Sequence, residues 1–354
     1  MTRKRNFPRL LALLCAGVLL TGCASAREIP AQPSASPTAA AAAQGTETPR
    51  RVSGFGLYFD TAVTVTLYEP EDGLLDDIWA ACARYEQLLS KTVAGSDVDR
   101  INRAGGERVQ VDPETWDILQ RAGEISRASG GAFSVSIAPL TALWDFTGGT
   151  ERVPTEEERL EALPLVNDAA IVLGEDGTVT LPAGMSIDLG GIAKGYIADR
   201  IAAMCRTRCQ GAVISLGGNT YVTGEKSDGS AYRVGVQDPQ DSRGAAVAVL
   251  SLRDGSVVTS GIYERCFEKD GVWYHHILDP ETGSSAMTDL ASATVVTESS
   301  MTADAVATAC IVLGSEGALR LLGELGLDGL LIGRDGTLWQ TEGFGDKYGM
   351  VLTQ

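Results

Sequence analysis

The sequence predicts an α+β fold in which antiparallel or mixed β-sheets are flanked by helices. Between residues 212 and 297, short runs rich in β-branched and aromatic residues follow one another with little room for helices. Consecutive strands with short connections pair antiparallel. Apolar residues at helical spacing stand both before and after this region. Segregated strands and helices of this kind are typical of the α+β class.

The first part of the globular region is expected to run from a strand into helices. Apolar and polar residues alternate within residues 55–68, which predicts one strand, and residues 74–89 carry apolar side chains at helical spacing. Asp-Pro at 112–113 supplies a cap and a first helical residue, and Gly-Gly at 130–131 supplies a stop. We therefore expect a helix from Pro113 to Ser129.

The middle of the chain is expected to contain short elements first and then a series of strands. Thr155 with Glu158 three residues later forms a capping box and predicts a short acidic helix. Residues 171–173 and 178–181 flank a Gly-Glu-Asp-Gly turn and predict a hairpin. A helix is expected from about Gly191 to Cys209. The strands expected after it are 212–216, 221–223, 232–236, 247–252, 257–260, 273–278 and 293–297.

The end of the chain returns to helices. Helical patterns cover residues 301–313 and 316–325. Two strands, 330–332 and 337–340, close the chain around an Asp-Gly turn.

Composition describes a soluble globular body. Hydrophobic residues at 44% and charged residues at 21% argue against disorder and against a multi-span membrane protein. The 354 residues suffice for one large domain or two closely joined halves. With a net charge of −17, the surface repels nucleic acid and anionic lipid head groups. No nucleic-acid partner is therefore expected.

Residues 1–22 predict a lipoprotein signal peptide. Four basic residues precede an apolar run, Leu10–Leu20, that is too short to span a bilayer. The following Leu-Thr-Gly-Cys resembles the bacterial lipobox, in which cleavage before the cysteine accompanies acylation of its sulfur with a fatty acid such as palmitate. Cys23 is thus the predicted lipidation site. The alternative is a plain secretory peptide cut near Ala24 or Ala26.

Residues 23–51 are predicted to be a lipidated tether. They are rich in Ala, Pro, Ser and Thr and lack apolar periodicity, so they cannot bury enough surface to offset chain entropy. The globular domain then spans residues 52–354. We expect the protein at the cell membrane, lipid-anchored on the extracytoplasmic face.

Five cysteines lie outside the signal peptide and the lipidation site. An odd number excludes a complete disulfide framework, although one bridge stays open. Two of them, Cys205 and Cys209, lie one helical turn apart without a second Cys/His pair, which is a weak zinc signal. We expect all five to be mostly buried small apolar residues. They are Cys82, Cys205, Cys209, Cys266 and Cys310.

A glycine-rich turn, Asp-Leu-Gly-Gly-Ile-Ala-Lys-Gly-Tyr at 188–196, leads into a helix. Free backbone N–H groups and the helix dipole let such a turn approach an anion, and Lys194 adds a point charge. The turn matches neither the P-loop nor the dinucleotide-binding fingerprint. A purely structural role for the glycines is the alternative.

Two further clusters carry candidate chemistry. His275 and His276 are the only histidines, and neighbours in a strand point to opposite faces, so at most one serves a given site. Asp304 and Thr308 are four residues apart and share one face of a predicted helix. Two hard oxygen ligands suit Mg²⁺. The alternative is an acidic residue in the first helical turn with the threonine bonded back along the helix.

In this order the clusters resemble the FAD:protein FMN transferase family, the ApbE lipoproteins. The resemblance covers about residues 54–345. Further strings in the family order are Gly-Gly-Ala-Phe-Ser at 130–134, Ala-Pro-Leu at 138–140, Leu-Trp-Asp-Phe at 143–146, Leu-Gly-Gly-Asn at 216–219 and Val-Thr-Ser-Gly at 258–261. Several such strings in sequence are a specific signal, whereas one would be weak.

The resemblance implies an enzyme that cleaves the pyrophosphate of FAD, esterifies FMN to a Thr or Ser of a target flavoprotein and releases AMP. FAD would lie in a pocket between two closely joined halves. His276 would take the acceptor proton, which leaves His275 dispensable. The implied Mg²⁺ ligands are Gly191, Asp304, Ala307 and Thr308. The implied FAD-site residues are Phe59, Thr92, Ala132, Phe133, Ser134, Asp188, Lys194 and Leu278.

The family usually serves subunits of membrane redox complexes, such as sodium-pumping NADH:quinone oxidoreductase and Rnf, or extracytoplasmic flavoproteins. Two positions depart from its pattern. The family's Met-Gly-Thr is Phe59-Asp60-Thr61 here, and Thr92 stands where many members have a tyrosine. The second departure predicts a wetter pocket, in which water competes with the acceptor hydroxyl.

Two other functions fit parts of the sequence. An FAD pyrophosphatase would use the same metal and pocket with water as the acceptor. A solute-binding lipoprotein would equally carry the signal peptide, the tether and the acidic surface. Such proteins usually alternate strands with helices in two lobes, whereas residues 212–297 do not.

Overall fold

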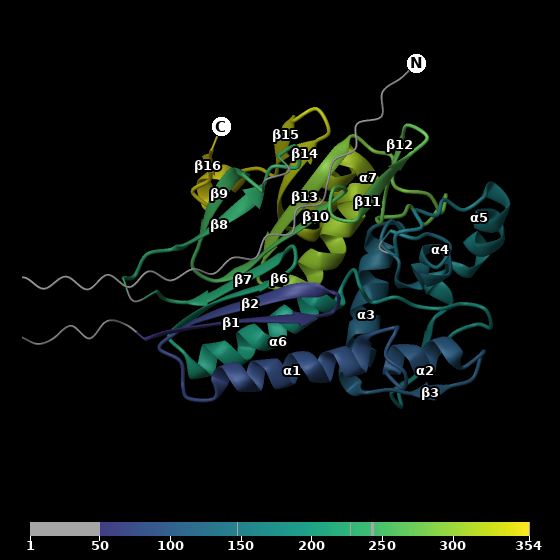
Figure 1. The fold of residues 1–354 in the computed structure, drawn as a ribbon, viewed down its shortest axis with the longest axis horizontal. Helices are drawn as coiled ribbons and strands as arrows, with labels where there is room; N and C mark the ends of the chain where they lie inside the picture. The colour runs from purple at the N-terminus through teal and green to yellow at the C-terminus, as the bar shows by residue number, and fades with distance from the viewer. Residues whose placement is uncertain (1–49, 147, 227, 242–243, 354) are drawn as a thin grey trace, which may run out of the picture. The chain divides into compact units, whose positions relative to one another are not determined.

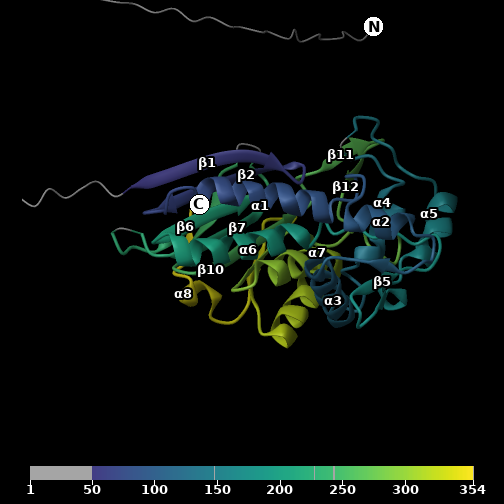
Figure 2. The same ribbon diagram turned by 90° about the horizontal axis from the view of Figure 1, so that it is seen from below.

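The structure is a computed structural model that describes residues 50–353 except 147, 227, 242 and 243. The predicted signal peptide, the lipidation site Cys23 and nearly all of the tether therefore lie outside the described residues. Within them the predicted α+β class is confirmed. Helices α1, α6 and α7 lie side by side on one face of the large sheet (Figures 1 and 2).

The large sheet has eight strands in the order β1-β2-β6-β7-β10-β13-β14-β15, and every neighbouring pair is antiparallel. The strands expected over residues 212–216, 221–223, 257–260 and 293–297 are all present in it. The strands are Arg51–Tyr58, Thr61–Tyr68, Gly211–Leu216, Asn219–Gly224, Gly255–Gly261, Leu290–Thr297, Asp328–Gly333 and Leu338–Gln340, in the order β1, β2, β6, β7, β10, β13, β14, β15.

The single strand expected over residues 55–68 is instead the β1–β2 hairpin. Tyr58 pairs with Thr61, so only Phe59 and Asp60 form the turn. Their φ angles are 57° and 54°, the left-handed conformation that a tight hairpin turn requires at both positions. Asn and Gly usually supply this conformation, so the turn has no signature in the sequence.

The principal helices follow the predictions closely. Helix α1 spans Leu74–Leu89 as expected, and α3 spans Pro113–Ala128, one residue shorter than expected. The Asp112 side chain caps α3, and the predicted capping box begins α5, Glu156–Ala162. Helix α6 spans Ala193–Arg208.

Helix α7, Ser300–Leu325, is the core helix of the described region. The two helices expected at 301–313 and 316–325 are one run interrupted at Gly314, whose φ of 72° and ψ of 177° are not helical. By length and composition α7 could cross a membrane, but 61% of its apolar window is buried inside the protein. Burial by the sheet and by α6 accounts for that apolar composition.

Smaller elements complete the architecture. Strand β12 ends at His275, whereas the expected strand ran to residue 278, so His276 lies outside the strand. Strand β11, which pairs with β12, was not predicted. The remaining helices are α2 Asp97–Arg103, α4 Ala138–Thr141 and α8 Phe344–Lys347. The remaining strands are β3 Val109–Gln110, β4 Val172–Leu173, β5 Thr178–Thr180, β8 Tyr232–Gln237, β9 Ala246–Leu252, β11 Cys266–Lys269, β12 Val272–His275 and β16 Val351–Leu352.

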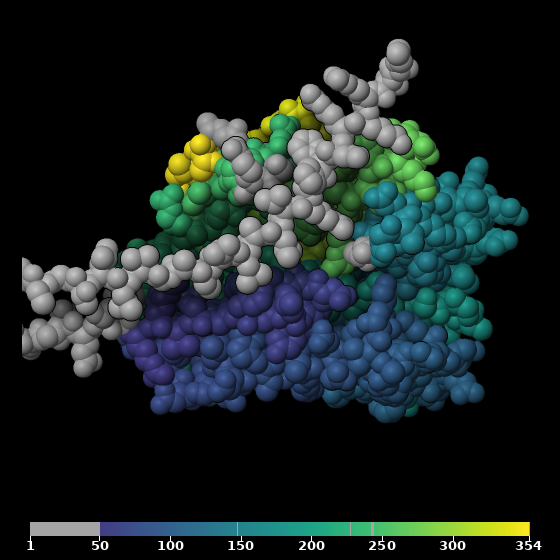
Figure 3. Space-filling model, viewed as in Figure 1, coloured from purple at the N-terminus to yellow at the C-terminus, as the bar shows by residue number. Residues whose placement is uncertain are grey.

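Apolar side chains form three buried clusters. The largest fills the space between the sheet and α1, α6 and α7. A second lies on the opposite face, against the small β16-β9-β8 sheet. A third gathers Leu140, Trp144 and Leu278 near α4 and α5, in the part of the chain that projects from the right of Figure 3. The described cysteines are free thiols. Cys82, Cys205 and Cys310 are buried as expected, whereas Cys209 and Cys266 are only half-buried.

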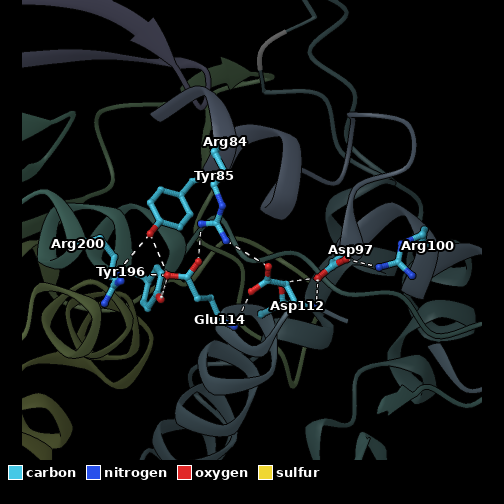
Figure 4. Close-up of polar contacts among 9 residues, drawn as sticks. Arg84, Tyr85, Asp97, Arg100, Asp112, Glu114, Tyr196 and Arg200 are labelled. Atoms are coloured by element: carbon cyan, nitrogen blue, oxygen red, sulfur yellow. Dashed lines mark hydrogen bonds and ion pairs between the residues drawn. The ribbon is translucent and has the colours of Figure 1, made fainter. Parts of the chain in front are cut away.

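A carboxylate network joins α1, α3 and α6 (Figure 4). Glu114 of α3 accepts hydrogen bonds from Tyr85 of α1 at 3.0 Å and Tyr196 of α6 at 2.8 Å, and it pairs with Arg84. Desolvation raises the pKa of Glu114, but these three donors outweigh it and keep the pKa below its ordinary value. The network fixes the first turns of α6 against α1 and α3.

Candidate active site

The predicted glycine turn lies at the start of α6. The Asp188 peptide N–H donates to the carbonyl of Val135 at 2.8 Å, which ties the turn to the segment that carries Phe133. The Asp188 carboxylate accepts from the Gly190 N–H at 2.8 Å. Ile192 supplies no side-chain cap to α6. Groups from outside the helix must therefore satisfy its first N–H groups.

Asp304 of α7 supplies that cap. Its Oδ2 accepts from the Gly195 N–H at 3.0 Å, and its two oxygens lie 3.2 and 3.3 Å from the Lys194 ammonium. Lys194 also donates to the Gly190 carbonyl at 2.8 Å. The Asp304 side chain is 4% exposed and that of Lys194 is 25% exposed. A buried charge of this kind persists only where it is paired and hydrogen-bonded.

Gly191, Thr308 and Phe133 meet at one place. A β-carbon on Gly191 would lie 3.2 Å from the Phe133 ring and 3.8 Å from Thr308 Oγ1. The Thr308 hydroxyl donates to the Asp304 carbonyl at 3.1 Å and lies 3.4 Å from Ser260 Oγ. The threonine therefore bonds back along the helix, as the alternative interpretation expected, while its oxygen faces the glycine turn. Ala307 beside it is fully buried.

These residues fit a hard divalent cation. Across residues 50–353, outside the four gaps, no three His, Cys, Asp or Glu side chains gather as a metal-ligand group. Asp304 would accordingly share a cation with the Thr308 hydroxyl and with main-chain oxygens. Oxygen ligands with few carboxylates suit Mg²⁺, which keeps several of its waters.

Both histidine rings have an Nδ1 that is buried without a hydrogen-bond partner among the described residues, but their other contacts differ. His275 is fully buried, and its Nε2 lies 3.0 Å from the Ala286 carbonyl. Its N–H donates to Ser285 Oγ, and its carbonyl accepts from the same hydroxyl. Desolvation lowers the pKa of His275 to about 4. The His275 ring is therefore part of the packed interior, and its dispensability for catalysis stays a prediction.

His276 lies just beyond the end of β12. Its peptide N–H donates to the Arg265 carbonyl at 3.0 Å, and its Nδ1 is buried without a hydrogen-bond partner among the described residues. Desolvation lowers the pKa of His276 to about 3, and the positive charges of Arg265 and Lys194 lower it further. The ring is thus neutral at pH 7, with an unused nitrogen.

The other predicted site residues have their own local contacts. Phe59 sits in the β1–β2 turn, where its N–H donates to Glu86 at 2.8 Å. Thr92 is exposed in the loop after α1 and shares a 3.0 Å hydrogen bond with Ser90. The Ser134 hydroxyl donates to Asp168 at 2.7 Å.

Two predicted residues show mainly apolar surroundings. Ala132 packs against the largest cluster, and Leu278 is buried in the third cluster. Two hollows, of about 610 Å³ beside α5 and about 300 Å³ beside α3, contain no predicted site residue. The predicted FAD pocket is neither of these hollows.

Sequence reasoning missed three charged residues near the site. Lys91 pairs with Asp188 at 2.6 Å, and Asp199 of α6 accepts from the first N–H groups of α7. Glu264 is an exposed residue, yet desolvation raises the pKa of its carboxyl, opposed by Lys194 and Arg265. No motif marked these residues, although Lys91 is next to a predicted one.

The fold matches solved flavin transferases. The superposition with the ApbE protein of Thermotoga maritima has a TM-score of 0.78 at 32% identity and covers 83% of this chain and 98% of that one. With the apo flavinyl transferase ApbE of Pseudomonas stutzeri the values are 0.77, 27%, 86% and 99%. Fold and site together define an enzyme of the flavin transferase class.

Sequence comparison identifies the family. The model of the ApbE family matches residues 59–331. The FAD:protein FMN transferase of Treponema pallidum is 37% identical over 291 residues, which cover 77% of this chain and 80% of that protein. One from Klebsiella pneumoniae is 35% identical over 258 residues, covering 72% and 80%. This chain belongs to the ApbE family.

Proposed function

We propose that this protein is a Mg²⁺-dependent FAD:protein FMN transferase, which attaches FMN through a phosphoester to a Thr or Ser of another protein and releases AMP. Family membership supports flavin transfer. The observation that supports phosphoryl chemistry at this site is the contact of Lys194 with both Asp304 and the Gly190 carbonyl. This contact brings the Lys194 ammonium, the buried Asp304 carboxylate and the glycine turn together at the start of α6.

The reaction requires one bond to form and one to break. The acceptor hydroxyl oxygen bonds to the phosphorus that carries the riboflavin, and the bond from this phosphorus to the AMP oxygen breaks. Mg²⁺ held by Asp304, Thr308 and the main-chain oxygens near Gly191 and Ala307 would neutralise charge on the phosphate oxygens. Lys194 and the start of α6 add positive potential on the same side.

His276 would take the proton of the acceptor hydroxyl. Its ring is neutral and its buried Nδ1 has no partner among the described residues. Desolvation is the largest cause of the low pKa of His276 in this ligand-free state, and the positive charges of Arg265 and Lys194 add to it. A bound diphosphate would offset both positive charges and raise that pKa, so the base would strengthen when substrate is present. General base catalysis is worth about 10²- to 10⁴-fold in rate.

Hydrolysis of FAD is the second candidate reaction. Thr92 is exposed and offers one hydroxyl, already bonded to Ser90, where a tyrosine would offer a ring. Less apolar area at this position favours water as a competing acceptor. The same metal and base would then yield free FMN and AMP.

The proposed location is the extracytoplasmic face of the cell membrane, through a lipid on Cys23. Its support is the basic start, the short apolar run and the lipobox-like Leu-Thr-Gly-Cys at 20–23. The proposed acceptors are flavin-carrying subunits of membrane redox complexes or extracytoplasmic flavoproteins. An enzyme tethered at that face would meet such acceptors directly.

Mass spectrometry tests the function. Membrane proteins from cells with and without the gene are digested, and peptides with an added FMN mass are sought. We expect at least one Thr or Ser peptide to carry FMN only when the chain is present. If flavin adducts are identical in both strains, while the purified protein with FAD yields only FMN and AMP, the protein is a pyrophosphatase and the transfer proposal is wrong.

A further inference from the structure

Lys91 reaches Asp188 of the predicted FAD site from the loop after α1, where it stands directly before Thr92. Its Nζ donates to Asp188 Oδ2 at 2.6 Å, across 97 positions of sequence. The side chain is 41% exposed, against 22% for Asp188. An ion pair so open to solvent contributes roughly 0–1 kcal/mol to stability. Fold stability is therefore a weak reason for this lysine.

The loop that carries Lys91 is held by its own hydrogen bonds. The Ser96 hydroxyl donates to the Ser90 carbonyl at 2.6 Å, and the Thr92 N–H donates to Ser90 Oγ at 3.2 Å. Ser96 also caps α2 by accepting from the Asp99 N–H at 2.9 Å. The backbone that carries Lys91 is thus held in place by these hydrogen bonds.

Two lysines flank the glycine turn, and their hydrogen bonds differ. An ammonium group has three N–H donors. Lys194 directs them at the Gly190 carbonyl and at both oxygens of Asp304, within 2.8 to 3.3 Å. Among the residues that the structure describes, Lys91 has one polar contact, with Asp188. Two of its donors remain for another acceptor beside the same turn.

We propose that Lys91 binds the diphosphate of FAD, with Asp188 orienting its ammonium group and Lys194 serving chiefly to hold Asp304. This inference rests on the proposed function, because it requires FAD at the glycine turn. It assigns the phosphate contact to a residue directly beside Thr92. A flexible lysine there supplies charge on the side where this chain lacks the tyrosine of many relatives.

Binding titrations separate this role from a structural one. Purified full-length protein is titrated by flavin fluorescence with FAD and with riboflavin, which lacks phosphate. Mg²⁺ is left out so that FAD is not cleaved during the titration. Lys91→Met is expected to raise the Kd for FAD about tenfold, the effect of losing one charge-assisted contact. It should leave the Kd for riboflavin unchanged. Lys91→Arg should recover most of the FAD affinity.

Lys269→Met is the matched control. Lys269 is an exposed lysine with one main-chain contact, to Glu151, in the β11–β12 hairpin. Its FAD affinity should equal that of wild type. Melting temperatures of Lys91→Met and Lys269→Met should stay close to wild type, because neither change removes a buried contact.

The Asp188→Asn background decides between two roles of Lys91. If Lys91 binds phosphate, Lys91→Met weakens FAD binding in this background too. If Lys91 only neutralises Asp188, its effect disappears there, and the proposal is wrong. Equal losses for FAD and riboflavin would also overturn it. Wild-type protein that binds no FAD at all would overturn the proposed function together with this inference, whereas unchanged binding by Lys91→Met overturns only the inference.

Discussion

Asp199 and Asp304 cap each other's helices. Asp304 of α7 accepts from the Gly195 N–H in the first turn of α6, and Asp199 of α6 accepts from the Ser300 and Met301 N–H groups at the start of α7, at 2.7 and 3.0 Å. The helices approach so closely that a β-carbon on Gly195 would lie 2.2 Å from the Ser300 carbonyl oxygen. Reciprocal capping therefore fixes Lys194 and Asp304 relative to each other.

The first prediction concerns pH and Asp199. Desolvation raises the pKa of Asp199 to about 6, although its N–H donors oppose this, so the folded state binds more protons than the unfolded state between about pH 4 and 6. This group makes the protein more stable as pH falls through that range. His275 has the opposite sign: its folded pKa of about 4 lies below the ordinary 6.5, so its stability contribution is lost as pH falls from 6.5.

Asp199→Asn should remove the acid-side gain and leave the histidine loss. We expect its free energy of unfolding to fall more steeply than that of wild type between pH 6 and pH 4, by up to about 1.4 kcal/mol per pH unit. Urea unfolding at several pH values measures this. Parallel curves for the two proteins would show that the Asp199 carboxyl does not titrate in this range.

The second prediction is that Asp304→Asn abolishes Mg²⁺-dependent transfer. The change removes the negative charge of the Asp304 side chain, which pairs with Lys194 and is the proposed cation ligand. A loss of at least about 100-fold in rate is expected, on the scale of removing one preorganised electrostatic contact. Chromatographic measurement of AMP against Mg²⁺ concentration checks it.

Asp117→Asn is the control for Asp304. Asp117 is an exposed residue of α3. Asp289 is not used as the control aspartate. Its carboxylate accepts hydrogen bonds from both the N–H and the hydroxyl of Ser315, after the break in α7, so its loss would disturb the fold. Full activity of Asp304→Asn, with Mg²⁺ dependence like that of Asp117→Asn, would remove the metal assignment.

The third prediction separates the histidines by two different measurements. His276→Ala should lose about 10²- to 10⁴-fold in rate while keeping its stability. His275→Ala should lose about 1–3 kcal/mol of unfolding free energy, since it leaves the Ala286 carbonyl without this partner in the interior. Rates and urea midpoints measured for both variants decide. Equal rate losses at equal stability would contradict the general-base assignment.

The fourth prediction is that Cys23→Ser releases the protein from the membrane. A lipid on this residue is the proposed anchor, and the −17 net charge offers no electrostatic attraction to anionic head groups. Detergent phase partitioning and cell fractionation measure the change. A variant as firmly membrane-bound as wild type would mean that another segment is the anchor.

The long helices could be predicted from the sequence because their signals are local, whereas the short helices α2, α4 and α8 were not predicted. Helix α1 has the predicted bounds since its apolar spacing is regular, and the Thr155 capping box is present because both partners lie within one turn. The Phe59–Asp60 turn could not, since neither residue favours its positive φ. The contacts of Asp199 with Ser300 and of Lys91 with Asp188 join residues about a hundred positions apart, and only tertiary packing creates them.

The last prediction concerns Thr92. Its hydroxyl is bonded to Ser90 and its side chain is exposed, so it offers the flavin little apolar area and leaves that side open to water. Purified protein with Mg²⁺ and FAD alone should therefore release AMP and FMN, and added acceptor should divert FMN to protein. Thr92→Tyr should lower hydrolysis more than transfer, because a ring would exclude water without removing the base or the metal ligands. Lys91 beside it stays in place in this variant, so FAD affinity should not fall.

Chromatography of AMP with and without acceptor measures both reactions. If wild-type protein releases no more AMP from FAD alone than His276→Ala does, another group shields the phosphorus and Thr92 does not set the balance.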